Sequence, residues 1–369
     1  MANKTARLGD LATYINGYAF KPADWGDTGL PIIRIQDLTG NSYQLNRYDG
    51  EYPERIEVND GDVLISWSAS LGVYVWQRGK ALLNQHIFKV VFDKLPVNKE
   101  YFVFAVEHKL AEMESKTHGA TMKHIVKKDF DGTTIPYPPI EKQAEIADHL
   151  RRITSLIDKQ TEQLLLLDQL VKSRFIELFG DPVRNSMGLP TEPMTTVCAI
   201  IDGDRGKNYP KQDEFSDTGY CLFLNAKNVT ATGFSFENRM FITKEKDNAL
   251  HNGKLERGDV VLTTRGTLGN LAFYDDSVPF ENVRINSGMV ILRMNKSVMT
   301  EVFFMEQFKL QLQSIKGKIA SGSAQPQLPI STMNKIRILL APMALQEQFA
   351  AFVEQTDKSK LCGKMEVAA

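Results

Sequence analysis

The chain contains an internal duplication, and this repeat constrains the fold more than any other feature. The segment VNDGDVLISWSASLG (58–72) pairs with LERGDVVLTTRGTLG (255–269) at a separation of 197 residues. LLNQHIFKVVF (82–92) pairs with RINSGMVILRM (284–294) at 202, and Pro139 pairs with Pro342 at 203. Because the matches stay in order while the separation grows only by short insertions, the sequence predicts two copies of one domain.

Each copy is expected to consist of short strands followed by a helix. Apolar runs bounded by Gly, Asp and Asn, such as 63–65 and 260–262, predict strands. Apolar residues at helical intervals predict helices near 101–113 and 302–315. We therefore predict an α+β fold: a pseudo-two-fold repeat of two tandem mixed α/β domains, at residues 1–138 and 186–341, separated by long coiled-coil-like helices.

A long helix is predicted in the segment 139–185, which would act as a central helical spacer. Apolar residues recur there with 4-3-4-3 spacing, as in a coiled-coil seam, and about 40 residues of helix would be about 60 Å long. We expect a partner helix or protein to contact the first turns and the seam, at Gln143, Ile146, Leu150, Ile153, Ile157, Leu164, Leu167 and Gln346. The alternative for the two glutamines is a helix cap.

A second helix is predicted at 342–369, and it is expected to be short. Its apolar spacing fades after Val353, and Lys358, Lys360 and Gly363 would not continue a seam. We therefore do not expect a full antiparallel partner for the central helix within this chain. This expectation places a second docking site for a partner protein in doubt.

Composition excludes several classes of protein. Of the 369 residues, 43% are hydrophobic and 24% are charged, as in a water-soluble protein of two or three domains. The sequence has no apolar run of membrane-spanning length and no signal-peptide pattern, and its three cysteines lack metal-ligand spacing. These features predict a cytoplasmic protein that has no contact with a membrane.

The distribution of charge is more informative than the net charge of −1. The windows 115–128 and 307–346 contain lysine, histidine or arginine and no acidic residue. Each window is suited to a phosphate backbone, which attracts cations without regard to base sequence. Chance clustering on a solvated face is the alternative for either window alone. Their matched places in the repeat favour a shared role.

Three polar segments recur in both copies beside the predicted strands, where side chains can reach base edges. The first contains Arg34, Gln36 and Asp37, matched by Asn225, Lys227 and Asn228. The second contains Ser66, Trp67, Ser68 and Ser70, matched by Thr263, Thr264, Arg265 and Thr267. The third contains Lys123 and His124, matched by Ser321, Ser323, Gln325 and Gln327.

Chemistry assigns different partners to these side chains. The guanidinium of Arg265 is suited to guanine, and the amides of Gln36 and Asn228 are suited to adenine. The structural alternative is that Asp37 and Asn228 only close turns and that Trp67 belongs to the core or its rim. The sequence contains no GxxxxGK[ST] loop, no HExxH and no Asn/Asp-Pro-Pro-Tyr motif, so we predict no catalytic site and no metal site.

The duplication, the GDVL…LG segments, the Pro-x-x-x-Gln openings at 139–143 and 342–346, and KSRFIELFGDP at the end of the long helix resemble the specificity subunits of type I restriction–modification enzymes. The resemblance covers essentially the whole chain. It implies that each copy is a target recognition domain that reads one half of a bipartite, asymmetric site in double-stranded DNA. The helices would set the spacer between the halves and dock two modification subunits.

The resemblance also implies what the chain lacks. In this family S-adenosylmethionine, ATP and Mg are used by the modification subunits and by separate restriction/translocase subunits, so no cofactor is expected here. Two other classes stay open. A two-headed architectural adaptor would bind proteins instead of DNA and would not need acid-free windows at matched positions. A nuclease or methyltransferase with an unrecognised site would act without added subunits.

Overall fold

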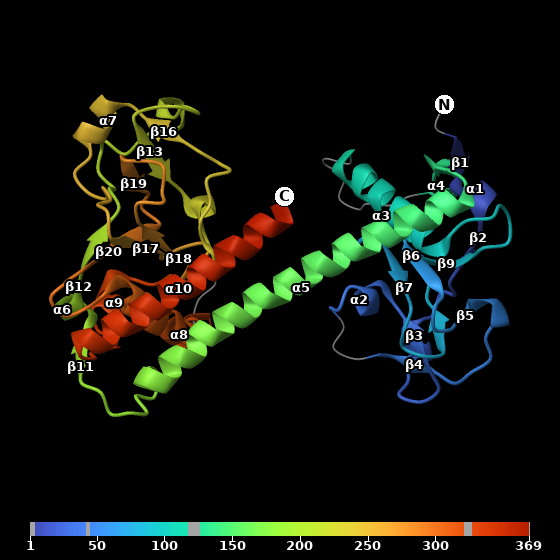
Figure 1. Cartoon of the computed structure of the whole chain (residues 1–369), viewed down its shortest axis with the longest axis horizontal. Helices are drawn as coiled ribbons and strands as arrows, with labels where there is room; N and C mark the ends of the chain where they lie inside the picture. The colour runs from blue at the N-terminus through green and yellow to red at the C-terminus, as the bar shows by residue number, and fades with distance from the viewer. Residues whose placement is uncertain (1–3, 42–44, 117–125, 321–326, 369) are drawn as a thin grey trace. The chain divides into compact units, whose positions relative to one another are not determined.

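The computed structural model describes residues 4–41, 45–116, 126–320 and 327–368. The chain divides into two compact units, Met1–Asp158 and Lys159–Ala369. Each unit combines short strands with helices, which confirms the predicted α+β class with two tandem domains (Figure 1). In the described part of the chain, no helix is both long enough and apolar enough to cross a bilayer.

Unit 1 contains two four-stranded sheets. The first has the order β2 (Thr13–Asn16), β9 (Ile87–Val91), β6 (Val63–Ser66), β7 (Gly72–Val75) and is antiparallel. The second has the order β4 (Arg47–Tyr48), β3 (Leu30–Ile33), β8 (Ala81–Leu83), β5 (Glu57–Val58), with β3 and β8 parallel. Its other elements are β1 (Thr5–Arg7), α1 (Leu8–Leu11), η1 (Pro22–Asp24), α2 (Ile35–Leu38), η2 (Glu54–Ile56), α3 (Lys99–Lys116), α4 (Lys127–Gly132) and β10 (Thr134–Pro136).

Unit 2 repeats this plan. Its antiparallel sheet has the order β12 (Cys198–Asp202), β20 (Met289–Met294), β17 (Asp259–Thr263), β18 (Leu271–Tyr274). A second sheet has the order β16 (Phe241–Ile242), β13 (Cys221–Leu224), β19 (Val283–Ile285), with β13 and β19 parallel. Its other elements are β11 (Thr191–Pro193), α6 (Met194–Val197), η3 (Gln212–Glu214), η4 (Ala226–Asn228), β14 (Val229–Thr230), β15 (Gly233–Phe234), α7 (Lys244–Ala249), α8 (Glu301–Ala320), α9 (Ile330–Met333), β21 (Arg337–Leu339) and α10 (Met343–Ala368).

One inner strand of each antiparallel sheet, β6 in unit 1 and β17 in unit 2, is apolar on both faces because both faces are covered. In β6, Val63 and Ile65 belong to the core that α3 covers, and Leu64 belongs to the core under the second sheet. Successive side chains of a strand point to opposite faces, so a continuous apolar run fits a strand between two layers. In unit 2, Val260 and Val261 divide between two cores in the same way.

The recurring Gly-Asp pair is explained by the turn that precedes this strand. Gly61 and Gly258 have φ of +89° and +96°, a region that favours glycine. The carboxylate of Asp62 accepts a hydrogen bond from the Asn59 amide at 2.9 Å, and Asp259 accepts one from Glu256 at 2.7 Å. The motif therefore closes a turn in each unit.

Helix α5 (Ile140–Phe179) has 40 residues, begins in unit 1 and ends in unit 2. Within unit 2 its last turns are part of the core, where the ring of Phe179 lies 4.6 Å from that of Phe303. Helix α10 continues through Lys358, Lys360 and Gly363 and ends at Ala368. Beyond the fading apolar seam the two helices are joined by an ion pair, in which Lys360 Nζ lies 2.8 Å from Asp168 of α5.

Candidate nucleic-acid interface

A parallel pair of strands brings two polar loops together in each unit. In unit 1, β3 is followed by Arg34 and β8 by Asn84, and the Asn84 amide donates to the carbonyl of Ile33 at 3.1 Å. At the corresponding place in unit 2, the backbone amide of Asn286 donates to the carbonyl of Leu224 at 3.2 Å. Because parallel strands end at the same edge of a sheet, polar side chains from distant parts of the chain meet there. We call this the reading edge: residues 34–37 and 84–86 in unit 1, and 225–228 and 286–288 in unit 2.

The second predicted segment joins this edge in both units. The Trp67 amide donates to the carbonyl of His86 at 3.3 Å, and the Thr264 amide donates to Gly288 at 2.8 Å. The third segment joins it in unit 2, where Arg265 and Gln327 form an antiparallel bridge. Three segments predicted separately therefore meet in unit 2.

Part of the third segment lies outside the described residues. This holds for Lys123 and His124 in unit 1 and for Ser321, Ser323 and Gln325 in unit 2. Nothing in the structure tests these predictions.

Sequence reasoning missed the loops 84–86 and 286–288. They contain Asn-Gln-His and Asn-Ser-Gly, and both lie inside segments that had been paired only as evidence of duplication. The available signal was a polar triplet between two apolar runs at matched positions. His86 has a positive φ of +72°, which is uncommon for a residue other than glycine, and its counterpart is Gly288.

Several predicted contact residues are buried and hold the loops in shape. Asp37 accepts from the Arg34 amide at 2.8 Å. The side-chain oxygen of Asn228 accepts from the backbone amide of Asn225 at 2.9 Å. Its side-chain nitrogen donates to the backbone carbonyls of Ser235 and Asn238. Burial and these internal hydrogen bonds fit the turn-closing alternative for Asp37 and Asn228, and their contact with bases stays an untested prediction.

The second segment contains three more buried residues. The hydroxyl of Ser66 donates to the carbonyl of Ser70, and that of Thr263 donates to the carbonyl of Thr267, four residues on in each unit. Thr264 donates through its hydroxyl to Gly288 at 3.0 Å. Ser66, Thr263 and Thr264 are therefore buried residues that support the loop, and their predicted contacts with bases stay untested.

Other predicted residues are exposed or half-buried. Arg265 is exposed and forms no ion pair with any described residue. Arg34, Trp67, Ser68 and Asn225 are half-buried, and the Trp67 ring lies 5.0 Å from His86 and 5.5 Å from Phe88, at the rim of the core. The exposed members are Gln36, Ser70, Lys227, Arg265, Thr267 and Gln327.

The acid-free windows divide into engaged and exposed cations. Lys127 Nζ lies 2.9 Å from Asp131, and Lys309 Nζ is bonded to Glu306. Arg337 donates to Thr191. Lys335 is exposed, so among the described residues of the second window it is positioned to attract a phosphate.

The Pro-x-x-x-Gln openings have a structural role. Gln143 is fully buried and accepts from the amide of Asn98, just before α3, at 2.9 Å. Gln346 accepts from the amide of Thr300, just before α8, also at 2.9 Å. Each glutamine therefore ties the start of one helix to the start of another. The helix-cap alternative fits Gln143 and Gln346, whose side chains are fully buried, and their contact with a partner stays an untested prediction.

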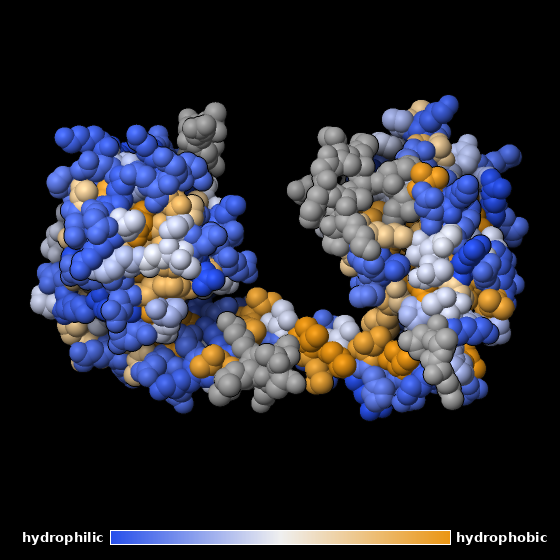
Figure 2. Space-filling model, turned by 90° about the horizontal axis from the view of Figure 1, so that it is seen from above, coloured by the Kyte–Doolittle hydropathy of each residue, from blue (hydrophilic) through white to orange (hydrophobic). Residues whose placement is uncertain are grey.

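Apolar side chains are exposed along α5 beyond the predicted seam. Of the seam positions, Ile153 and Ile157 are exposed, and Ile146, Leu150, Leu164 and Leu167 are half-buried. Leu156, Leu165, Leu166 and Leu170, outside the seam, are also exposed. In Figure 2, hydrophobic surface gathers along the helical part of the chain. A helix that is apolar on several sides is normally covered on more than one side.

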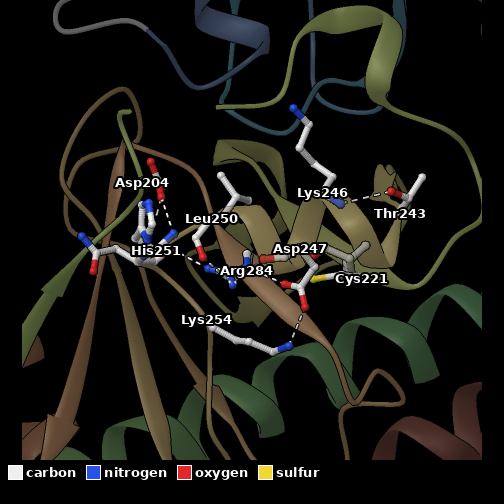
Figure 3. A network of polar contacts seen from close by, with 11 residues as sticks. Asp204, Cys221, Thr243, Lys246, Asp247, Leu250, His251, Lys254 and Arg284 are labelled. Atoms are coloured by element: carbon white, nitrogen blue, oxygen red, sulfur yellow. Dashed lines mark hydrogen bonds and ion pairs between the residues drawn. The ribbon is translucent and has the colours of Figure 1, made fainter. Parts of the chain in front are cut away.

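A buried network of ion pairs and hydrogen bonds joins Asp247, Lys254 and Arg284 in unit 2 (Figure 3). Arg284 donates to the carboxylate of Asp247 and to the carbonyl of Asn252 at 2.7 Å, and Lys254 Nζ lies 2.6 Å from the same carboxylate. Burial opposes ionisation of Asp247, but the hydrogen bonds from Lys254 and Arg284 prevail and lower the pKa of its carboxyl. The network fastens the segment around α7 to β19. Unit 1 has Leu82 at the matching place.

Two buried cysteines of unit 2, Cys198 and Cys221, are not suited to nucleophilic chemistry. Burial, with a smaller contribution from Asp247, raises the pKa of the Cys221 thiol to about 12, and burial raises that of Cys198 to about 12. A thiol with so high a pKa is a poor nucleophile at neutral pH. Within the described ranges, no three His, Cys, Asp or Glu side chains are grouped to hold a metal ion.

Comparison with known proteins agrees with this architecture. The sequence matches the family model "Type I restriction modification DNA specificity domain" at residues 2–167 and again at 195–363. It is 29% identical over 315 residues to the type I restriction enzyme EcoBI specificity subunit of Escherichia coli, covering 78% of this chain and 64% of that protein. It is 25% identical over 379 residues to the MjaVIII specificity subunit of Methanocaldococcus jannaschii, covering 96% of this chain and 86% of that protein.

Two solved structures share the fold. The S subunit of a type I restriction–modification system from M. genitalium has a TM-score of 0.58 at 15% identity, over 99% of this chain and 92% of that one. A chain from a study of complex assembly and conformational transition in a type I system has a TM-score of 0.53 at 16% identity, over 99% and 92%. Since the family model matches most of the sequence in two copies, the chain belongs to the family of type I restriction–modification specificity subunits.

Proposed function

We propose that this protein recognises DNA within a type I restriction–modification complex, and that each unit reads one half of a bipartite, asymmetric site. The observation that carries the proposal is the reading edge. Both units build it with the same backbone hydrogen bonds, such as Asn84 to Ile33 and Asn286 to Leu224. The side chains on this shared frame differ, with Gln36 exposed in one unit and Lys227 in the other. Two loops with the same backbone hydrogen bonds but different exposed side-chain donors and acceptors can recognise two different half-sites.

Arg265 is the side chain in unit 2 best suited to direct reading. Its backbone is held by the bridge to Gln327 and by a hydrogen bond to Gly288 at 3.3 Å, while its side chain projects into solvent. A guanidinium on a fixed backbone can donate two parallel hydrogen bonds to O6 and N7 of guanine. We therefore assign a guanine to the half-site of unit 2.

The helices supply the spacer and the docking surface in this proposal. A 40-residue helix is about 60 Å long, which is commensurate with half-sites one to one and a half turns of DNA apart. The exposed side chains of Leu156, Leu165, Leu166 and Leu170 offer modification subunits an apolar surface. The chain itself would be non-catalytic and cytoplasmic. The modification subunits would use S-adenosylmethionine, and restriction/translocase subunits would use ATP and Mg.

The decisive experiment is co-expression with type I modification subunits, followed by mapping of methylated adenines. We expect a two-part motif with an unread gap. Replacing residues 186–341 with the corresponding segment of a related specificity subunit should change only one half of the motif. Methyl transfer by the purified chain alone, or a replacement that alters both halves, would contradict the proposal.

Docking is tested separately on α5. We expect Leu166→Gln to weaken binding of a modification subunit at least tenfold, because an apolar contact becomes polar. The control is Gln169→Ala, an exposed position on the same helix. Equal affinity of both variants would remove this surface from the proposal.

The adaptor alternative is distinguished by salt. Counterion release makes DNA affinity fall steeply as salt rises. Binding that stays constant between about 50 and 200 mM salt would favour an adaptor.

A further inference from the structure

The loop 84–86 of unit 1 has an uncommon backbone conformation at His86. Its φ is +72°, in the left-handed region that a residue with a side chain seldom adopts. The matching residue of unit 2, Gly288, has no side chain and lies outside this region. A left-handed residue other than glycine is unfavourable, and such residues concentrate at binding and catalytic sites. Unit 1 therefore accepts a backbone cost at His86 that unit 2 avoids.

The same loop encloses two polar atoms that have no hydrogen-bond partner. In unit 2, the side-chain oxygen of Asn286 accepts from the backbone amide of Gly288 at 2.9 Å, and this bond closes the loop. In unit 1, Oδ1 of the matching Asn84 and Nδ1 of His86 are buried without a partner among the described residues. Buried atoms of this kind are costly and need an explanation other than stability. The loop of unit 1 thus carries a second sign of function.

A tryptophan holds the imidazole of His86 at the rim of the core. The two ring centres lie 5.0 Å apart in an edge-to-face arrangement, and the Trp67 ring stacks in turn on Phe88. In unit 2 the residue that matches Trp67 is Thr264, whose hydroxyl donates to the carbonyl of Gly288. Unit 1 therefore has a pair of rings where unit 2 has a hydrogen bond from a side chain to the backbone.

The surroundings of the imidazole determine which nitrogen can meet DNA. An enclosed N–H without an acceptor is rarer in proteins than an enclosed acceptor without a donor, so we place the proton on Nε2 and leave Nδ1 as the acceptor. His86 is half-buried, and Nε2 is neither enclosed nor bonded to a described residue. It is therefore a hydrogen-bond donor on a ring of fixed orientation.

We propose that His86 is a base-reading residue of unit 1, whose Nε2–H donates to N7 of a purine in its half-site; this rests on the proposed function. A base is favoured over a phosphate. A phosphate is held by cations that can move, and its contact requires neither a strained backbone nor a ring held by a second ring. N7 of a purine is an acceptor at a defined place in the major groove, which a single directed donor can match.

The test changes one atom of the DNA and uses the complex of the full chain with modification subunits. The unit 1 half-site is the half of the motif that replacement of residues 186–341 leaves unchanged. Each of its purines on either strand, apart from the methylated adenine, is exchanged in turn for the 7-deaza analogue, which has carbon in place of N7. We expect the rate of methylation by the wild-type complex to fall about 3- to 10-fold at one purine only, as for the loss of one hydrogen bond.

Two variants of His86 should lose this sensitivity to the exchange of N7. His86→Gly removes the imidazole and suits the left-handed backbone. His86→Phe keeps a ring beside Trp67 but has no N–H donor. If the ring only supported the loop, His86→Phe would behave as wild type, whereas we expect it to be as insensitive as His86→Gly.

The matched control is Ala69→Gly. Ala69 also has a positive φ, of +61°, and its counterpart in unit 2 is Gly266. This variant relaxes the backbone of a neighbouring loop and should keep the sensitivity at the same purine.

Four results would overturn the inference: a wild-type complex that is insensitive to every exchange of N7 in this half-site, an equal loss at every purine, sensitivity that persists in His86→Gly or His86→Phe, or its loss in Ala69→Gly. Failure of the proposed function would look different, because the wild-type complex would then show no two-part motif.

Discussion

Replacement of Phe179 by alanine tests whether the end of α5 belongs to the core of unit 2. The side chain is fully buried, and its ring centre lies 4.6 Å from Phe303, 5.0 Å from Phe175 and 5.7 Å from Phe349. A buried Phe→Ala change costs about 3–5 kcal/mol, and three aromatic neighbours place this site near the middle of that range or above it. At about 4 kcal/mol, a domain of this size should melt about 8–16 °C lower.

The distribution of tryptophan makes the assay specific to each unit. Trp25, Trp67 and Trp76 all lie in unit 1, so tryptophan fluorescence follows unit 1 while far-ultraviolet circular dichroism follows both units. In Phe179→Ala we expect the circular dichroism transition of unit 2 to move and the fluorescence transition to stay. The control is Ile176→Ala, three residues earlier and 36% exposed, with an expected cost below about 1 kcal/mol. If both variants cost the same, the end of α5 is not a core element.

Three further predictions concern single interactions. Asp247→Asn should destabilise unit 2 by about 3–5 kcal/mol at neutral pH, because it leaves Arg284 buried without a counter-charge. Since the folded pKa of Asp247 is lowered, its contribution is present above about pH 4 and is lost as pH falls through the folded value, so circular dichroism melts of the variant should show a weaker acid dependence than wild type. Gln143→Ala should lower the unfolding free energy of unit 1 by about 1–3 kcal/mol and shift the fluorescence transition, whereas Gln346→Ala should leave that transition in place. Arg265→Ala should change stability by less than about 0.5 kcal/mol but reduce discrimination at one base pair of the unit 2 half-site by about 5- to 150-fold in the methylation assay; a stability loss without loss of discrimination would refute its assigned role.

The duplicated architecture could be predicted from the sequence because it depends on local order. The spacing between Gly-Asp turns, apolar runs and prolines is preserved along the chain, and these features specify turns, strands and helix starts wherever they occur. The resemblance to specificity subunits followed from the same spacing. The ion pair between α10 and α5 could not be predicted in this way. The seam of α10 fades, but the helix continues through Lys360, whose ammonium group pairs with Asp168 of α5. Apolar periodicity does not detect an ion pair between helices.

The reading edge was only partly predictable because it depends on contacts between distant residues. The loop 84–86 meets residue 34 only because β3 and β8 pair in parallel, about 50 positions apart, and nothing local indicates that pairing. The burial of individual side chains could not be predicted from the sequence either. Asp37 and Gln36 are adjacent and polar, yet one side chain is enclosed and the other is exposed. A polar loop therefore indicates the place of a binding surface but does not identify the side chains that form it.

The division between buried and exposed polar residues explains how one frame can serve two half-sites. Asn228 and Thr263 are enclosed and bonded to main-chain carbonyls, so their replacement would alter the shape of the loop. The side chains of Lys227 and Arg265 lie next to residues of this kind but form no hydrogen bond with the described part of the loop, so they can change with little effect on folding. Residues that determine loop shape and residues that face solvent thus alternate along the same few positions. Binding specificity in such a protein can diverge between two copies while the topology and the turn hydrogen bonds of both copies stay the same.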